Sequence, residues 1–230
     1  MKELLRHLER KRGEHLEELG EFLSIPSVST RPEHAEDVKR AASWVAQRLT
    51  AAGLLDVTVH QTAGHPIVTA RTLQQKGAPT VLVYGHYDVQ PPDPLELWES
   101  PPFEPQVRKN KLFARGASDD KGQVFIYLKV LEAFAEVQGG VPINVKLVLE
   151  GEEEVGSPHF GALAEAYADL LQADGCLWED GGFDPSGRPG MALGAKGLLY
   201  IQLDVQALGR DAHSGAAGTL PSAAWRLVQA

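Results

Sequence analysis

Residues 80–88 of the chain read Thr-Val-Leu-Val-Tyr-Gly-His-Tyr-Asp, an apolar run that ends in the polar side chains of His86 and Asp88. The run from Thr80 to Tyr84 is almost wholly apolar, as strands buried on both faces tend to be. Positions two apart in a strand point to the same side, so Asp88 could orient the imidazole of His86. Metal-binding histidines commonly have such a carboxylate partner. A hydrogen bond within an ordinary turn is the alternative interpretation.

Helix and strand patterns alternate on both sides of this run. Apolar runs predict further strands at 57–60, 67–73, 143–149 and 175–178, and helical spacing predicts helices at 4–23, 35–49, 120–137 and 159–171. The Ile25-Pro26 pair should end the first helix, and Gly53 should cap the second. This alternation predicts an α/β fold with a mostly parallel central sheet flanked by helices.

The pattern changes near Gly190. Apolar and polar residues alternate over 199–205, which predicts a half-exposed strand, and a helix should start near Pro221. We therefore expect a second domain to begin there. The last helix reaches Ala230 without a Gly, Asn or Pro stop signal, so we expect the chain to be cut within it.

Composition excludes several classes of function. The chain has 31 acidic and 22 basic residues and a net charge of −9, which argues against binding to a nucleic-acid backbone. No apolar run approaches the roughly 20 residues needed to cross a bilayer, so no membrane partner is expected. The amphipathic N-terminus lacks the apolar core of a secretory signal, and the single Cys176 cannot form an internal disulfide. These features predict a cytoplasmic protein.

Three further acidic segments follow predicted strands or open a helix. In open α/β sheets, ligands collect at the carboxyl ends of the strands. The segments are Ser118-Asp119-Asp120, residues 150–157 (EGEEEVGS) and Glu179-Asp180. A helix cap, a solvated charged face and an acidic turn are the ordinary interpretations. Two adjacent aspartates exceed what one cap needs, so one can cap while the other faces a cation. A divalent cation would also relieve repulsion among the clustered glutamates.

Four motifs together carry a family resemblance: YGHYDVQPP at 84–92, RGASDDKG at 115–122, EGEEEVGS at 150–157 and DAHSG at 211–215. In this order they resemble the cocatalytic zinc exopeptidases and deacylases, which include carnosinase, carboxypeptidase G, acetylornithine deacetylase and succinyl-diaminopimelate desuccinylase. The first two motifs are most similar to the carnosinase and cytosolic nonspecific dipeptidase branch. The resemblance implies that residues 1–192 are the N-terminal portion of a metal-binding catalytic domain and that 193–230 begin a lid and dimerisation domain.

The resemblance also implies roles for the first two motifs. His86 would bind one metal ion, Asp88 would orient that histidine, and Asp119 would bridge two ions, with a cis peptide bond between Asp119 and Asp120. Asp180 would complete the first site, with Glu179 as the alternative.

The glutamate run and the lid motif receive the remaining roles. Glu153 would be the general base and Glu154 a ligand of the second ion, while Glu152 would fill a variable position; a one-residue shift of this alignment stays open. His213 would stabilise the oxyanion, reaching the active site of the other subunit in a homodimer, or could be a surface turn residue. The family takes the last ligand of its second zinc from a late histidine, and none follows His213 here.

The implied function is hydrolysis of amide bonds in dipeptides or small peptides by an activated water, with two divalent metal ions as cofactors. Zn²⁺ is expected, and the carboxylate-rich ligand set also suits Mn²⁺ or Co²⁺. An N-acyl-amino-acid deacylase and a noncatalytic relative are the alternatives. A serine hydrolase is disfavoured because Ser214 lies in no G-x-S-x-G elbow. With one ligand missing, the 230-residue chain itself is expected to be inactive.

Overall fold

The computed structural model describes residues 1–178, 181–182, 185–188, 190–194 and 196–230. The chain divides into two compact units, Met1–Gly182 and Phe183–Ala230. Among the described residues, no helix is both long and apolar enough to cross a membrane.

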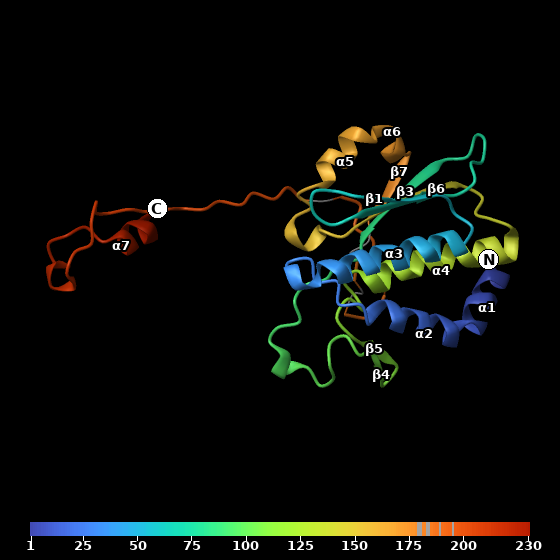
Figure 1. Ribbon diagram of the computed structural model, residues 1–230, viewed down its shortest axis with the longest axis horizontal. Helices are drawn as coiled ribbons and strands as arrows, with labels where there is room; N and C mark the ends of the chain where they lie inside the picture. Colours follow the sequence, from blue (N-terminus) through green and yellow to red (C-terminus); the bar gives the residue numbers. More distant parts are fainter. Residues whose placement is uncertain (179–180, 183–184, 189, 195) are drawn as a thin grey trace. The chain divides into compact units, whose positions relative to one another are not determined.

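A five-stranded sheet forms the centre of the first unit (Figure 1). Its strands, in order across the sheet, are β1 (Leu55–His60), β2 (Ile67–Arg71), β6 (Asn144–Glu150), β3 (Thr80–His86) and β7 (Gly175–Trp178). β3 runs parallel to both β6 and β7, whereas β2 runs antiparallel to both of its neighbours. Four of the five strands described in this sheet therefore point the same way. The expected mostly parallel sheet is confirmed in direction, with β2 as the reversed member of a mixed sheet.

The strand register brings the ends of β3 and β6 and the start of β2 together at one end of the sheet. His86 at the end of β3 pairs with Glu150 at the end of β6, and Glu150 also pairs with Ile67 at the start of β2. Because β2 is reversed, the segment before it, rather than the segment after it, reaches this end. The predicted ligand positions thus begin where β3 and β6 end.

Helices cover both faces of the sheet because β6 alternates its apolar side chains between two clusters. Val145, Leu147 and Leu149 join the core beneath α3 (Ala35–Ala51) and α4 (Lys121–Gln138). Val148 packs on the other face, against α5 (Phe160–Ala166) and α6 (Ala168–Leu171). This period-two alternation is what a strand buried on both faces requires. Figure 1 shows α3 and α4 on one side of the sheet and α5 and α6 on the other.

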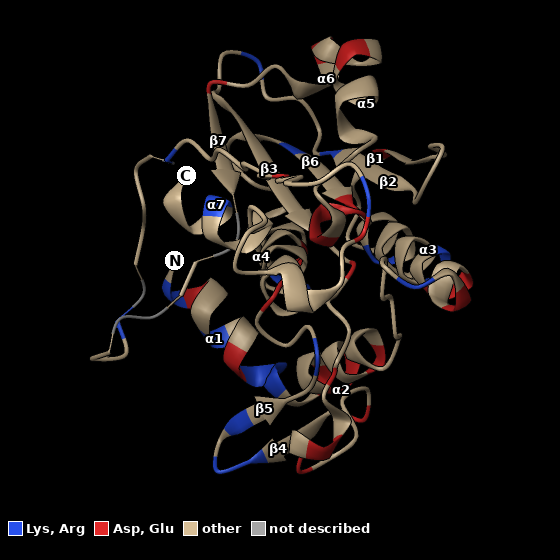
Figure 2. Cartoon of the chain, turned by 90° about the vertical axis from the view of Figure 1, so that its left-hand side faces the viewer, with Lys and Arg blue, Asp and Glu red and all other residues tan. Residues whose placement is uncertain are grey.

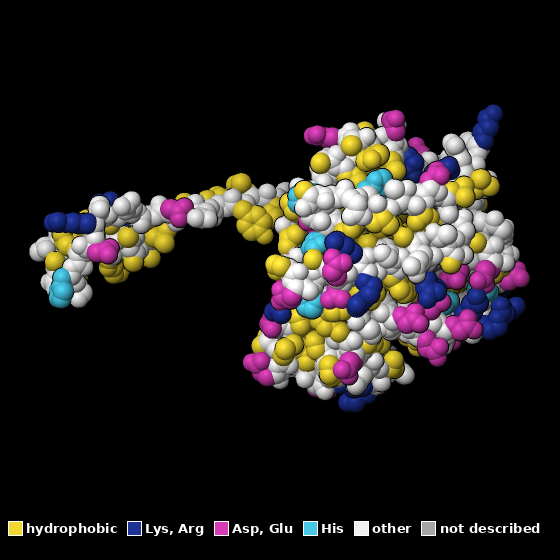
Figure 3. Space-filling view, viewed as in Figure 1, with side chains coloured by type: hydrophobic (Ala, Val, Ile, Leu, Met, Phe, Trp, Pro, Cys, Tyr) yellow, Lys and Arg dark blue, Asp and Glu magenta, His cyan; other side chains and the backbone are white. Residues whose placement is uncertain are grey.

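Two expected helices are each divided in two. The first is α1 (Lys2–Arg10) and α2 (Arg12–Leu23), separated at Lys11, whose φ of −88° and ψ of 4° leave the helix. The break places the ammonium of Lys11 2.8 Å from Glu136 on α4. Figure 3 shows acidic and basic side chains interleaved over α1, α2 and α4. The second division, between α5 and α6, lies at Tyr167, whose ring packs 4.8 Å from that of His60.

Short elements complete the first unit. A hairpin of β4 (Gln106–Arg108) and β5 (Lys111–Phe113) was not expected from the sequence; its turn residues Lys109 and Asn110 have φ of 50° and 61°. Three 3₁₀ helices are Pro32–His34, Leu95–Leu97 and Glu153–Val155. The last of these carries the predicted base and second-ion ligand.

The second unit contains less regular structure than expected. The described residues 196–207 are not in a strand, so the predicted strand over 199–205 is wrong. Its alternating pattern needs a neighbouring strand to hydrogen-bond with, and the described part of this unit holds none. A 3₁₀ helix (Ser214–Ala216) is followed by α7 (Ala223–Gln229), where Ser222 Oγ accepts the backbone N–H of Trp225. The predicted domain boundary after residue 192 stays a prediction.

Candidate metal centre

His86 lies at the carboxyl end of β3 with its side chain buried. Its Nε2 is 3.0 Å from Oδ1 of Asp119, and its Nδ1 is 3.1 Å from the carbonyl oxygen and 3.3 Å from Oδ1 of Asp88. Carbonyl and carboxylate oxygens only accept hydrogen bonds, so Nδ1 is the nitrogen that carries a proton. Nε2 faces the carboxylate of Asp119, so it also carries a proton in the metal-free chain, and loss of that proton would leave Nε2 as the nitrogen that a metal ion could take.

Asp120 fixes the backbone of this histidine from the start of α4. Its carboxylate is buried, and Oδ2 accepts the backbone N–H of His86 at 3.0 Å. Asp120 occupies the N-cap position of α4, but no side chain caps that helix. The prediction that one aspartate caps is therefore wrong, because Oδ2 of Asp120 is committed to His86. The Asp119–Asp120 peptide bond is cis, as the resemblance implies.

Gly85 makes this close approach possible. A Cβ at this position would lie 2.8 Å from Oδ2 of Asp120 and 2.8 Å from Cγ2 of Val124. Real Cβ atoms almost never sit so close to another heavy atom, so a side chain here would push the start of α4 away from β3. The glycine before the histidine therefore sets the separation of the two motifs.

Asp88 joins the histidine to the glutamate run. Its carboxylate is fully buried; Oδ2 accepts the hydroxyl of Ser29 at 2.6 Å and the backbone N–H of Glu154 at 3.2 Å. Oδ1 accepts the backbone N–H of Glu153 at 3.2 Å and faces His86. A buried carboxylate is tolerated when such donors surround it. One side chain thus holds the two motifs together.

The glutamates of the run point in different directions. Figure 2 shows acidic segments beside the end of β6. Glu150 is buried and accepts the hydroxyl of Tyr84 at 2.5 Å and that of Ser157 at 2.9 Å. Glu152, also buried, lies 2.8 Å from Nδ1 of His159. Tyr84 and Ser157 thus hold the carboxylate of Glu150, and His159 holds that of Glu152.

The next two glutamates lie nearer the histidine. Oε2 of Glu153 is 3.9 Å from Nε2 of His86. Glu154 accepts the backbone N–H of Gln90 at 3.2 Å and the side-chain N–H of Gln90 at 2.6 Å. The predicted base is thus the glutamate that reaches the imidazole, while the predicted ligand rests on Gln90.

The charges around His86 favour a cation. Burial lowers the pKa of His86, but the hydrogen bond and charge of Asp88 and the charges of Asp120 and Glu153 outweigh burial and raise it to about 10. Burial raises the pKa of Glu154, and the charge of Asp119 adds to this despite the hydrogen bond from Gln90. The cluster therefore carries more negative charge than its own residues neutralise. A proton on the imidazole or a bound cation relieves it.

The donor types fit a divalent metal ion, although the described ligand set is partial. An imidazole with carboxylates is a ligand combination that zinc, manganese and cobalt accept. Across the residues that the structure describes, no three His, Cys, Asp or Glu side chains converge in metal-binding geometry. The predicted ligand Asp180 and its alternative Glu179 lie outside the described residues. His213 lies in the second unit, where its Nδ1 accepts the backbone N–H of Gly215 at 3.0 Å.

Comparison with known proteins identifies the family. The model of peptidase family M20/M25/M40 matches residues 82–220, more than half of the chain. This chain belongs to peptidase family M20/M25/M40. The matched range includes His86, Asp119 and the glutamate run.

Individual relatives agree with this M20/M25/M40 assignment. A cysteinylglycine-S-conjugate dipeptidase from Corynebacterium striatum is 36% identical over 216 residues, which are 93% of this chain and 47% of that protein. A succinyl-diaminopimelate desuccinylase from Xylella fastidiosa is 34% identical over 134 residues, 58% of this chain and 33% of that protein. The crystal structure of an M20 family metallo-carboxypeptidase from Sulfolobus solfataricus superposes with a TM-score of 0.77 at 33% identity, covering 94% of this chain and 48% of that one. The chain thus spans about half the length of relatives that match most of it.

Sequence reasoning missed three residues that support this M20/M25/M40 site. Ser29 bonds to Asp88, and His159 pairs with Glu152. Gly64 packs against that pair, since a Cβ there would lie 1.9 Å from Oε1 of Glu152. The serine-rich segment after Ile25-Pro26 reads only as a loop, and nothing in the local sequence signals a bond across 59 positions.

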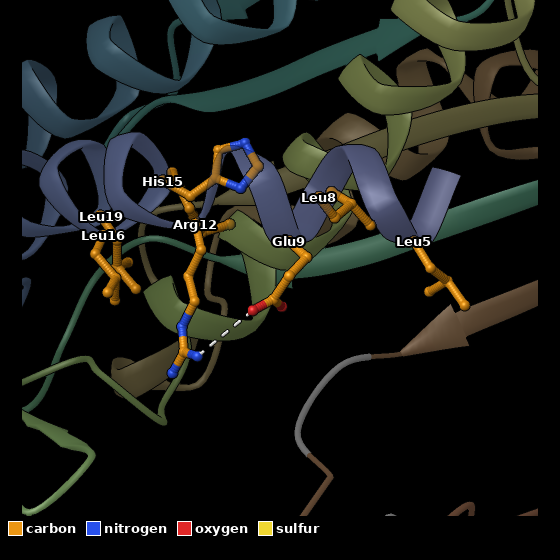
Figure 4. A pocket seen from close by; sticks show the side chains of 8 residues that line it. Leu5, Leu8, Glu9, Arg12, His15, Leu16 and Leu19 are labelled. Atoms are coloured by element: carbon orange, nitrogen blue, oxygen red, sulfur yellow. Dashed lines mark ion pairs between the residues drawn. The ribbon is translucent and has the colours of Figure 1, made fainter. Parts of the chain in front are cut away.

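The chain also has a hollow of about 310 Å³, and none of the predicted metal-binding or catalytic residues lines it. It lies along α1 and α2, where Figure 4 shows Leu5, Leu8, Leu16 and Leu19 around the ion pair of Glu9 and Arg12. Phe125 of α4 contributes to the lining. The chemistry-bearing side chains are therefore at the sheet edge, not in this hollow.

Proposed function

We propose that the complete protein carrying this chain hydrolyses amide bonds of dipeptides or small peptides with the help of divalent metal ions. The observation that carries the proposal is the 3.0 Å approach of His86 Nε2 to Asp119 Oδ1, with Asp88 behind the ring, at the carboxyl end of β3. The dipeptidase and metallo-carboxypeptidase relatives support the reaction class.

The two proposed metal ions share Asp119 as a ligand. His86, Asp119 and Asp180 hold one ion, and Asp119 and Glu154 contribute to the second. Two divalent ions held by these residues would supply an activated water and polarise the substrate carbonyl. Zn²⁺ is the proposed metal, with Mn²⁺ or Co²⁺ as chemically suitable substitutes.

Glu153 is the proposed general base. Its side chain is about one-third exposed, so the carboxylate can meet both the water and the substrate. It would accept the proton of the attacking water and return it to the leaving amine. Asp88 keeps Glu153 in reach by accepting its backbone N–H.

His213 is the proposed partner of the oxyanion, acting across a homodimer through the lid domain. A donor at that position stabilises charge that develops only in the transition state. Its exposure in the second unit leaves the ring accessible.

An N-acyl-amino-acid deacylase is the second candidate function, favoured by the similarity to the desuccinylase. Both reactions need the same attack on an amide carbonyl. A noncatalytic relative is disfavoured by the presence of both His86 and Glu153.

Side-by-side assays of the complete protein separate these functions. The substrates are a dipeptide and an N-acetyl amino acid, each with added Zn²⁺ or Mn²⁺ and with a chelator as control. Faster, chelator-sensitive hydrolysis of the dipeptide is expected. Preference for the N-acetyl amino acid would favour the deacylase, and hydrolysis of neither substrate would refute the proposal.

A further inference from the structure

The hydroxyl of Ser29 makes a direct hydrogen bond to the carboxylate behind the candidate metal ligand. Ser29 Oγ lies 2.6 Å from Oδ2 of Asp88, and Asp88 Oδ1 lies 3.3 Å from Nδ1 of His86. The two oxygens of a carboxylate move together when it rotates about its Cβ–Cγ bond. A hydrogen bond that fixes one oxygen therefore fixes the other. The serine thus contacts the group that faces the imidazole.

The segment that carries Ser29 is fixed to the strand end by a neighbouring serine. Ser27 Oγ donates to the carbonyl oxygen of Tyr87 at 2.6 Å, and the backbone N–H of Val89 donates to the carbonyl oxygen of Ser27 at 3.0 Å. Ser27 is fully buried. These bonds run on both sides of Asp88 in sequence, so the segment cannot move without moving the residues around that carboxylate.

Two further contacts hold the same segment from other directions. Lys121 Nζ, fully buried, donates to the carbonyl oxygen of Ile25 at 2.6 Å, which ties the segment to the residue that follows Asp120. His65 Nε2 donates to the carbonyl oxygen of Ser29 at 3.1 Å. The serine hydroxyl is therefore presented from a backbone that is bonded to both ligand-bearing motifs.

We propose that Ser29 is a positioning residue for the metal centre: its hydroxyl fixes the plane of the Asp88 carboxylate, which in turn sets the orientation of the His86 ring. This inference rests on the proposed function only in naming a metal ion as the ligand of His86. Ser29 itself touches neither the ion nor the substrate in this scheme. Outer partners of metal ligands typically change metal affinity by about 10–100-fold, and a residue one bond further out should act at the low end.

The test compares Ser29→Ala with Ser29→Thr and with Ser24→Ala in the 230-residue chain. Thr keeps the hydroxyl, whereas Ala removes it. Ser24 is a matched control because it lies in the same stretch and its Oγ, within the part of the chain that the structure describes, bonds to the carbonyl oxygen of Gly20 at 2.8 Å and to no metal-site residue. Zn²⁺ affinity is measured by calorimetric titration, and the ring signals of His86 are followed by NMR in the metal-free chain.

The expected result is an affinity about 10-fold weaker in Ser29→Ala, restored to within about twofold in Ser29→Thr and unchanged in Ser24→Ala. The His86 ring signals should shift in Ser29→Ala alone. Unchanged affinity and unchanged signals in Ser29→Ala would overturn the proposal, as would a loss that Ser29→Thr does not restore. If Ser29→Ala does not fold, Ser29→Cys replaces it, because a thiol of similar size is a weak donor.

A different result would refute the proposed function. If the wild-type chain binds no Zn²⁺ and the complete protein hydrolyses no amide, that function is wrong. The His86 signals of the metal-free variants still decide whether Ser29 positions the ring.

Discussion

Oδ1 of Asp88 accepts the backbone N–H of Glu153 at 3.2 Å, although 65 positions separate the two residues. The bond ties the end of β3 to the 3₁₀ turn that follows β6. It explains how the turn can present one glutamate to His86 while the others point elsewhere. It also makes the assignment of Glu153 testable by itself.

Glu153→Gln in the complete protein should lower kcat for a dipeptide by at least about 10²–10⁴-fold while metal content stays near that of the wild type. The amide keeps the shape of the side chain but cannot accept the proton of water. Glu154→Gln is the matched variant and should lose metal. Elemental analysis beside the kinetic assay checks both; metal loss in Glu153→Gln would place the glutamate run one residue out of register.

Asp88→Asn should destabilise the metal-free chain by about 2–3 kcal/mol in urea unfolding. The charged acceptor of three N–H and O–H donors is replaced by an amide whose NH₂ faces some of them, and hydrogen bonds to buried charges are among the stronger ones. Asp93→Asn is the control, since Asp93 is exposed and forms an ion pair with Arg31 at the surface; it should cost less than about 1 kcal/mol. Equal effects of the two substitutions would show that the buried network contributes no extra stability.

Gly85→Ala should destabilise the chain by about 1–3 kcal/mol, because the new methyl group meets Asp120 and Val124 at 2.8 Å. Gly20→Ala provides the opposite control: it lies inside α2 with open space around its Cβ position, so it should stabilise by about 0.5–1 kcal/mol. Thermal and urea unfolding measure both. A neutral Gly85→Ala would mean that α4 can move away from β3 at no cost.

Glu150 should make stability depend on pH. Burial raises its pKa above 4.5, outweighing the hydrogen bonds from Tyr84 and Ser157. As pH rises from 4.5 towards the raised value, the folded chain holds a proton that the unfolded chain has lost, so the free energy of unfolding falls. Glu150→Gln removes this group, and its stability relative to wild type should therefore increase with pH across that window.

Urea unfolding at several pH values in metal-free buffer measures this difference. Glu165→Gln, at an exposed carboxylate on α5, should keep the wild-type profile. A constant difference between wild type and Glu150→Gln at all pH values would contradict the expectation.

The sequence predicted the strands of the sheet and most of its helices because burial on two faces leaves long apolar runs such as 80–84 and 143–149. It also placed His86 and the aspartate pair at strand and helix ends. It could not predict that β2 is reversed, since direction depends on pairing between distant segments. The breaks at Lys11 and Tyr167 were missed because the apolar spacing continues across each of them.

The remaining errors have two causes: some elements are too short to show a period, and elsewhere contacts distant in sequence decide the structure. The three-residue strands of the β4–β5 hairpin are too short to produce a periodic pattern, and the alternating residues 199–205 had the pattern without a neighbouring strand. One of the two adjacent aspartates was expected to cap α4, but the carboxylate of Asp120 accepts the backbone N–H of His86 instead. The bond from Ser29 to Asp88 was missed for the second reason, because a serine in a loop carries no local signal of a partner 59 positions away.

Because β2 is reversed, the loop before it lies at the His86 end of the sheet and the loop after it lies at the opposite end. This difference decides where a tag or label can be inserted. The hairpin before Ile67 carries Gly64 and His65, which contact Glu152 and Ser29, so a peptide tag inserted there would disturb the ligand-bearing turn. The connection at residues 72–79 leaves β2 at the opposite end, where Arg71 pairs with Lys146 and Thr80 with Asn144. A fluorescent label or affinity handle placed in 72–79 is therefore the one expected to report on this domain without perturbing its chemistry.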